Sequence, residues 1–182
     1  MHSLLVRIDF VLATLLLVVV PLGLLAASVR RSAVRGPLLA YWRASSLLMI
    51  TVYLMIDGRP MAFVAGNLAL VGIPLALWFG DVLFDAAERP STSHGAARWF
   101  RRWRGAVTIF CGASLLLTLP ALRCVWAPET AACQDWWGPP RELHAALHPS
   151  LDPGGLGDAA TVGLVVYGVY GIASVVRRAA GR

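Results

Sequence analysis

Five long apolar runs divide the chain, and shorter polar segments separate them. Each run has about 17–24 residues, and about 20 residues of α-helix cover the ~30 Å hydrocarbon core of a bilayer. We therefore expect five transmembrane helices, at about residues 10–29, 38–56, 61–84, 106–122 and 160–176. The predicted fold class is an all-α polytopic membrane helix bundle, with residues 1–182 forming a single integral membrane domain.

The boundaries of the runs carry local signals. Residues 57–60 read Asp-Gly-Arg-Pro, a turn sequence that predicts a tight antiparallel hairpin between the second and third spans. The first run exceeds the ~7–15 apolar residues of a signal peptide, so we interpret it as a retained span. Kinks are expected at Pro21 and Pro74, because proline cannot donate a backbone hydrogen bond.

Composition and charge support this assignment and orient it. The chain is 58% hydrophobic and 14% charged, against roughly 25% charged residues in soluble domains. Segments on one side of the membrane hold most of the arginines: Arg30, Arg31, Arg35, Arg89, Arg98, Arg101, Arg102, Arg104, Arg177, Arg178 and Arg182. The other side holds Arg7, Arg59, Arg123 and Arg141. This asymmetry predicts a lumenal or periplasmic N-terminus and a cytoplasmic C-terminus.

The net charge of +6 does not indicate nucleic-acid binding, since the arginines lie where apolar runs end and meet anionic lipid headgroups. Before the fourth span, Trp99 and Trp103 lie four residues apart among arginines. This spacing predicts an interfacial helix that anchors the chain at headgroup level. Docking of this helix to an acidic partner surface is the alternative.

Two charged residues fall inside predicted spans. Arg43 and Asp81 each lie about one turn from the cytoplasmic end of the hairpin, at similar depth. A charge at that depth is costly unless it is paired, so we predict an intramembrane ion pair. A proton or ion path is the alternative, but only Asn67 and a few hydroxyl groups would continue it.

The segment 123–159 is the predicted outer loop. Cys124 and Cys133 are nine residues apart in an oxidising compartment, which favours a disulfide. A zinc site that adds His144 and His148 is the second reading, although its cysteine spacing is longer than usual, and free thiols are the third. Trp136 and Trp137 follow the second cysteine, and we predict that they too lie at the membrane interface.

The chain offers little for catalysis. It has no paired carboxylates, no GxSxG elbow and no phosphate-binding loop, and its four histidines all lie outside the predicted spans. We therefore expect no enzymatic activity, no catalytic residues and no resident cofactor. Binding of chlorophyll, carotenoid or lipid at the periphery stays open.

Three segments resemble a known family. They are Tyr41-Trp42-Arg43 followed by Thr51-Val52-Tyr53-Leu54-Met55-Ile56, the loop from Cys124 to Gly157, and Val165-Val166-Tyr167-x2-Tyr170. Together they resemble a cyanobacterial family of five-span membrane proteins that is a domain of unknown function. The resemblance implies a thylakoid membrane, or the plasma membrane where thylakoids are lacking.

Two functions follow as hypotheses. The first is a non-enzymatic accessory protein of a photosynthetic membrane, a small subunit or assembly factor of a photosystem-type complex. Its partners would be membrane lipids and that larger complex. The alternative is a small transporter or a membrane-embedded enzyme that handles a lipid or quinone, with Arg43, Asn67 and Asp81 lining its pocket.

Overall fold

The computed structural model describes residues 2–28, 35–84 and 94–181, and these ranges are almost entirely helical. The elements in chain order are α1 (His2–Thr14), η1 (Leu15–Val19), α2 (Val20–Ser28), α3 (Arg35–Ile56), α4 (Met61–Phe84), α5 (His94–Thr118), η2 (Leu119–Val125), α6 (Ala131–Leu147) and α7 (Pro153–Ala180). No strand occurs within the described ranges. The predicted all-α fold is thus confirmed.

Five helical stretches among the described residues are long and apolar enough to cross a membrane, which makes this an integral membrane protein. They are Ser3–Ala26, Leu38–Ile56, Met61–Gly80, Arg98–Val125 and Pro153–Ser174. The predicted number of spans is confirmed, and the second span matches its predicted bounds. The first, fourth and fifth begin about seven or eight residues earlier than predicted, because their first turns are helical despite their polar residues.

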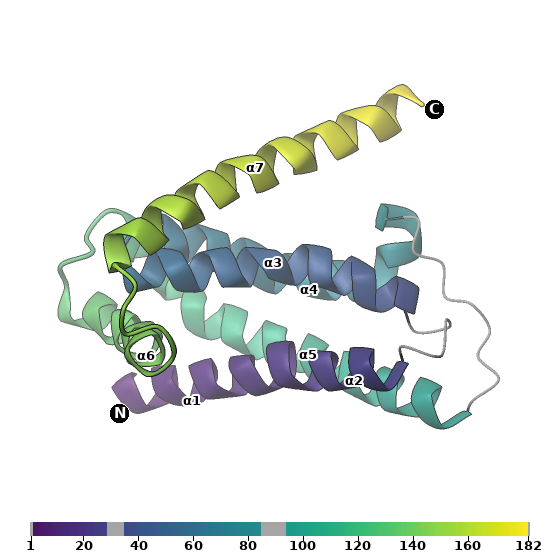
Figure 1. Ribbon diagram of the computed structural model, residues 1–182, viewed down its shortest axis with the longest axis horizontal. Coiled ribbons are helices and arrows are strands. Elements are labelled where there is room, and N and C mark those ends of the chain that lie inside the picture. The colour runs from purple at the N-terminus through teal and green to yellow at the C-terminus, as the bar shows by residue number, and fades with distance from the viewer. Residues whose placement is uncertain (1, 29–34, 85–93, 182) are drawn as a thin grey trace.

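The first span is a continuous rod made of α1, η1 and α2, and it lies beside α5 (Figure 1). η1 is a turn of π-helix, in which the amide of Val20 donates to the carbonyl of Leu15. Pro21 follows directly and has no N–H for the carbonyls of Leu16 and Leu17. The prediction at Pro21 was a kink, and what the structure has is a turn of π-helix just before this proline.

The α3–α4 hairpin forms as predicted, and Gly58 adopts a positive φ of 73° in its turn. The two helices approach closely along their length. A Cβ atom built on Gly66 would lie 3.1 Å from the Thr51 side chain, and one on Gly80 would lie 3.1 Å from the Cβ of Ala40. In α4 the backbone leaves helical geometry at Phe79, with φ −122° and ψ 22°, rather than at Pro74 as expected.

The segment predicted as the outer loop, residues 123–159, contains a helix of its own. It contains α6, which lies across one end of the bundle near the α3–α4 turn and is seen end-on in Figure 1. We call this end the α6 end. Helix α7 begins at Pro153, and the Asp152 side chain caps it by accepting from the amide of Gly155 at 2.8 Å.

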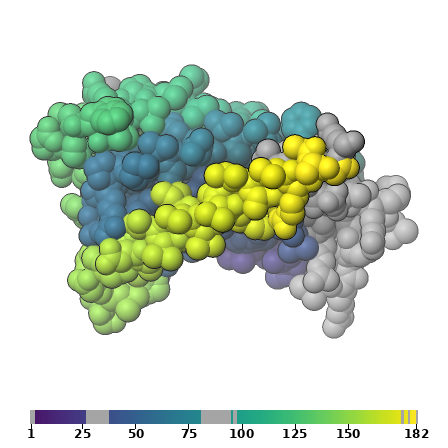
Figure 2. Space-filling model, turned by 90° about the horizontal axis from the view of Figure 1, so that it is seen from above, coloured from purple at the N-terminus to yellow at the C-terminus, as the bar shows by residue number. Residues whose placement is uncertain are grey.

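Helix α7 has a different relation to the bundle from the other spans. Near its start it packs on α3, where Gly163 contacts Ile50. Toward its C-terminus it diverges from α3 (Figure 1), and from above it runs obliquely across the molecule (Figure 2). Most of the C-terminal half of α7 therefore lacks contact with the other described helices.

Candidate functional site

The four walls of an intramembrane cavity are formed by α1, α3, α4 and α5, and its volume is about 380 Å³. Trp136 and Pro139 of α6 close it at the α6 end, and Leu17 of η1 lies at the other end. Its lining is mostly apolar, with five aromatic side chains: Phe10, Trp42, Phe63, Phe110 and Trp136. Such a concave, aromatic-lined space with a few polar groups is typical of a small-molecule site.

Polar groups line the cavity on all four helices, and those of α1, α4 and α5 hydrogen-bond between helices. The Ser114 hydroxyl of α5 donates to the carboxylate of Asp9 on α1. One turn further along α5, the hydroxyl of Thr118 donates to the side-chain oxygen of Asn67 at 3.0 Å. The amide nitrogen of Asn67 in turn donates to the carbonyl of Phe63 at 2.7 Å. This arrangement places a carboxylate and an amide on one side of the cavity.

Sequence reasoning missed Asp9, because the first span was predicted to begin at residue 10. The helix in fact begins at His2, so Asp9 lies inside the span. A signal was present in the spacing: Val6, Asp9, Ala13 and Leu17 follow the helical period and all line the cavity. A carboxylate on that face should have been expected inside the bundle.

The predicted Arg43–Asp81 ion pair stays a prediction, since the Asp81 side chain lies outside the described residues. Arg43 is on an exposed face of α3. The contact between Ala40 and Gly80 places the two helix ends side by side. Asn67, the third polar residue of the predicted pocket, lines the cavity together with Asp9; Arg43 does not line it.

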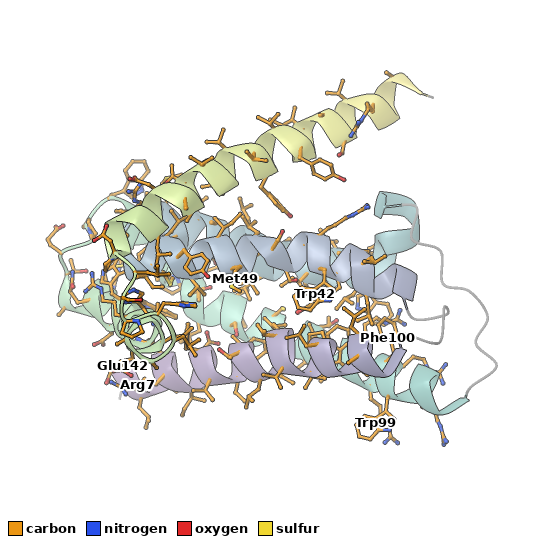
Figure 3. The ribbon with its side chains drawn as sticks, in the orientation of Figure 1. Arg7, Trp42, Met49, Trp99, Phe100 and Glu142 are labelled. Atoms are coloured by element: carbon orange, nitrogen blue, oxygen red, sulfur yellow. A yellow bond between two sulfur atoms is a disulfide. The ribbon has the colours of Figure 1, made fainter. Side chains whose placement is uncertain are left out.

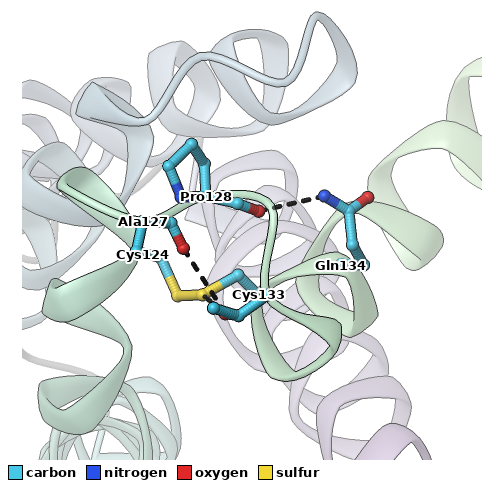
Figure 4. Close-up of a disulfide and its surroundings, with 6 residues drawn as sticks. Cys124, Ala127, Pro128, Cys133 and Gln134 are labelled. Carbon is cyan, nitrogen blue, oxygen red and sulfur yellow. Dashed lines mark hydrogen bonds between the residues drawn. A yellow bond between two sulfur atoms is a disulfide. The ribbon is translucent and has the colours of Figure 1, made fainter.

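The predicted disulfide joins Cys124 and Cys133, with a Cα–Cα distance of 5.7 Å (Figure 4). Next to it, the side chain of Gln134 donates to the carbonyl of Pro128 at 2.9 Å. Both sulfur atoms are in the disulfide, so the cysteine ligands of the zinc reading are not free thiolates. The described residues hold no group of three metal-binding side chains.

His144 and His148, the two histidines of the alternative zinc site, make other contacts. A ring nitrogen of His144 lies 3.0 Å from the carbonyl oxygen of Leu151, and His148 ends α6 as its C-cap. Both residues therefore belong to the connection between α6 and α7.

Three of the four predicted interface tryptophans are buried, which corrects that prediction. Trp136 and Trp137 are 6% and 2% exposed, because α6 packs onto the end of the bundle and Trp137 meets Phe63 edge to face. Trp103 is 5% exposed, and its indole N–H donates to the carbonyl of Leu16 at 2.9 Å.

Only Trp99 of that set has the exposure of an interface anchor. It is 69% exposed and projects from α5 away from the bundle (Figure 3). Trp126, which follows η2, is 88% exposed and was not predicted. Of the neighbouring arginines, Arg104 lies over the Trp78 ring at 4.1 Å and near the carbonyl of Leu77, so it packs against the protein.

Ion pairs gather at the α6 end. Arg7 of α1 meets Glu142 of α6 at 2.5 Å (Figure 3), which ties the first span to the helix across the bundle end. Arg59 of the α3–α4 turn contacts Asp57 and, on α7, Asp158. From the sequence, Arg7 and Arg59 were predicted to lie on the side of the membrane with fewer positive charges, and no partner was predicted for either.

Comparison with known proteins gives a family and no functional relative. No curated protein and no solved structure matches the chain. The predicted resemblance to an uncharacterised membrane-protein family is confirmed at the level of the family. A family model described as a protein of unknown function (DUF3177) matches residues 3–182, nearly the whole chain, and the protein belongs to this family.

Proposed function

We propose that this protein is a non-enzymatic accessory protein of a photosynthetic membrane, a small subunit or assembly factor of a photosystem-type complex. In this proposal α7 is the helix that contacts the complex. The observation that carries it is the apolar surface of α7, which the other described helices leave uncovered between Val162 and Val176.

The exposure of α7 is high on successive turns. Its uncovered apolar residues are Val162, Val165, Val166, Val169, Ile172 and Val176, between 59% and 67% exposed. Gly168 lies among them, and a Cβ atom there would meet nothing within 4 Å. In membranes, small residues let two helices approach closely, so this face suits another transmembrane helix as well as lipid.

The attachment of α7 favours a fixed contact surface over a loosely held tail. Arg59 holds the start of α7 through Asp158 and through Thr161, whose hydroxyl accepts at 2.8 Å. Because one end of α7 is anchored and the other diverges from the bundle, α7 presents its apolar face at a defined angle.

The membrane and its orientation complete the proposal. The resemblance described above supports a thylakoid membrane, or a plasma membrane in an organism without thylakoids. The excess of arginines on one side supports a cytoplasmic C-terminus and a lumenal or periplasmic α6 end. The disulfide at the α6 end is consistent with that side.

The test is native electrophoresis of membranes solubilised in mild detergent, with the protein detected by an epitope tag. We expect comigration with photosystem components and loss of comigration in Gly168→Leu, because the larger side chain separates the two helices. Gly112→Leu is the matched control, since a Cβ atom on Gly112 of α5 also meets nothing within 4 Å. Migration of the wild-type protein only as a free small species would contradict the proposal.

A small transporter or lipid- or quinone-handling enzyme is the second candidate, and the cavity is the observation that favours it. Asn67, expected in its pocket, does line the cavity. Uptake or turnover measured with reconstituted protein would support this candidate.

A further inference from the structure

We propose that the cavity between α1, α3, α4 and α5 is a binding site for an uncharged lipid whose head is a ring bearing hydroxyl or carbonyl oxygens. Quinones and quinols are the chemical class that fits this description. The inference concerns binding alone, and it holds whether or not α7 contacts a larger complex.

The polar side of the cavity recognises the head. The carboxylate of Asp9 accepts from Ser114 and has a second oxygen that can accept from a ligand hydroxyl. The amide of Asn67 donates one N–H to Phe63 and has a second N–H for a ligand oxygen. A carboxylate beside an amide therefore offers both an acceptor and a donor, which is what a hydroxyl- or carbonyl-bearing ring requires.

The acidic side chain of Asp9 limits the choice of head. Within the described ranges no basic side chain forms an ion pair with it, although it lies inside a membrane span. An intramembrane carboxylate needs a functional or structural reason, and hydrogen bonds from a ligand would supply one. A phosphate or fatty-acid head would place a second acidic group beside the Asp9 carboxyl group, so anionic lipids are disfavoured.

The apolar part of the cavity lining suits a flat ring. Five aromatic side chains line the cavity, and aromatic rings pack favourably edge to face or offset against another ring. The volume of about 380 Å³ lies near the lower end of the ~300–1,000 Å³ range of ligand pockets. This volume accommodates a ring and the first part of a chain, so a longer tail must leave the cavity.

The exit for the tail lies beside α3. Met49 lines the cavity but is 53% exposed, and Ser46 one turn before it is also exposed, so the cavity reaches the lipid-facing surface there. Figure 3 shows Met49 and Trp42 on the same helix. The closed end is at α6, where Trp136 is only 6% exposed. A head bound near Asp9 would thus extend its chain past Met49 into the bilayer.

The test uses the full chain in phosphatidylcholine nanodiscs, titrated with decylubiquinone and decylubiquinol while tryptophan fluorescence is recorded. Trp42 and Trp136 line the cavity, so a quinone bound there should quench them saturably, at one molecule per protein. Ala13→Phe should abolish the saturable component, because Ala13 lines the cavity. Ala113→Phe is the matched control, on an exposed face of α5, and should leave binding unchanged.

The head is tested separately. Asp9→Ala should weaken decylubiquinol binding by about tenfold or more, the usual effect of losing a hydrogen bond to a charged group. Should this variant fail to fold, Ser114→Ala, which removes the donor that orients Asp9, replaces it and should weaken binding in the same direction. Decylbenzene, which has the chain and the ring without oxygens, should bind more weakly than decylubiquinol.

Four results would overturn the inference. They are the absence of saturable quenching in the wild type, unchanged binding in Ala13→Phe, equal affinity for decylbenzene, and tighter competition by dodecylamine than by decylubiquinol. The last would assign the carboxylate to a cationic head.

Discussion

At the scale of single residues, Arg59 connects the α3–α4 turn to α7. Its guanidinium contacts Asp57 at 2.6 Å, Asp158 at 2.6 Å and the Thr161 hydroxyl at 2.8 Å. The hydrogen bonds that Arg59 donates to Asp57, and then to Asp158, raise the pKa of Arg59 above its ordinary value. The arginine therefore stays protonated over the whole working range of pH. Gly157 packs against Asp57, and this close approach requires glycine, which has no side chain, at position 157.

Gly157→Ala should destabilise the protein, because the new Cβ atom would overlap the Asp57 side chain. Overpacking of this kind costs about 1–3 kcal/mol, measured as a change in the free energy of unfolding in detergent. Gly168→Ala is the control, since its Cβ atom meets open space and alanine favours helix by up to about 1 kcal/mol. Equal stability of the two variants would contradict the close packing of Gly157 against Asp57.

The residue-scale predictions from sequence succeeded where chemistry acts over a short distance along the chain. Cys124 and Cys133 are close in sequence, and their pairing followed from spacing and compartment. Trp103 and Trp136 were assigned to the interface from composition, but burial depends on which helix packs over them. Asp9 was missed because the helix start was placed one residue after it. Such start points are the least certain feature of a hydropathy pattern.

At the scale of elements, the π-helical turn in the first span has a physical account. Pro21 has no N–H to give to the carbonyls of Leu16 and Leu17, and an unpaired carbonyl is costly in a membrane. Two side chains from other spans supply the donors: the indole of Trp103 bonds Leu16, and the hydroxyl of Tyr41 bonds Leu17. The irregular helix is thus joined to α3 and α5.

Tyr41→Phe should lower the free energy of unfolding by about 1–3 kcal/mol, because it leaves the buried carbonyl of Leu17 without this donor. Combining it with Pro21→Ala should recover part of the loss, since alanine restores a backbone N–H. A double-mutant cycle measures this coupling. Strictly additive effects of the two substitutions would contradict the account of the π-helical turn.

Among the elements outside the membrane spans, the sequence predicted the turn between α3 and α4 but not helix α6. The residues 57–60 specify the hairpin directly, through the positive φ of Gly58 and the proline that follows. Helix α6 was not predicted, because Pro139 and Pro140 argue against helix in the sequence. Burial of that helix against the bundle end stabilises it in spite of its local propensity.

At the scale of the whole molecule, five spans could be predicted because the length of an apolar run is set by the thickness of the bilayer. The cavity and the divergence of α7 could not, because both depend on how helices pack against one another. An apolar sequence is equally compatible with lipid, a ligand or another helix. Orientation stays a prediction from the arginine distribution.

Orientation can be tested by labelling single cysteines with a membrane-impermeant maleimide in intact bacterial cells that express the protein in their plasma membrane. Glu129→Cys should react from outside, and Gly95→Cys should react only after permeabilisation, because Glu129 precedes α6 and Gly95 opens α5. Cys111 is buried and should stay unlabelled. The reverse pattern would invert the topology and the meaning of the arginine excess.

The central claim, that α7 contacts a larger complex, is tested most directly by photo-crosslinking in native membranes. A photoreactive amino acid replaces Val169, which is 63% exposed on α7, and Ile109, which is 76% exposed on α5, serves as the comparison. Mass spectrometry identifies the adducts. The account predicts one dominant protein adduct from position 169, a photosystem-type subunit, and mainly lipid adducts from position 109. Lipid adducts alone at position 169 would contradict it.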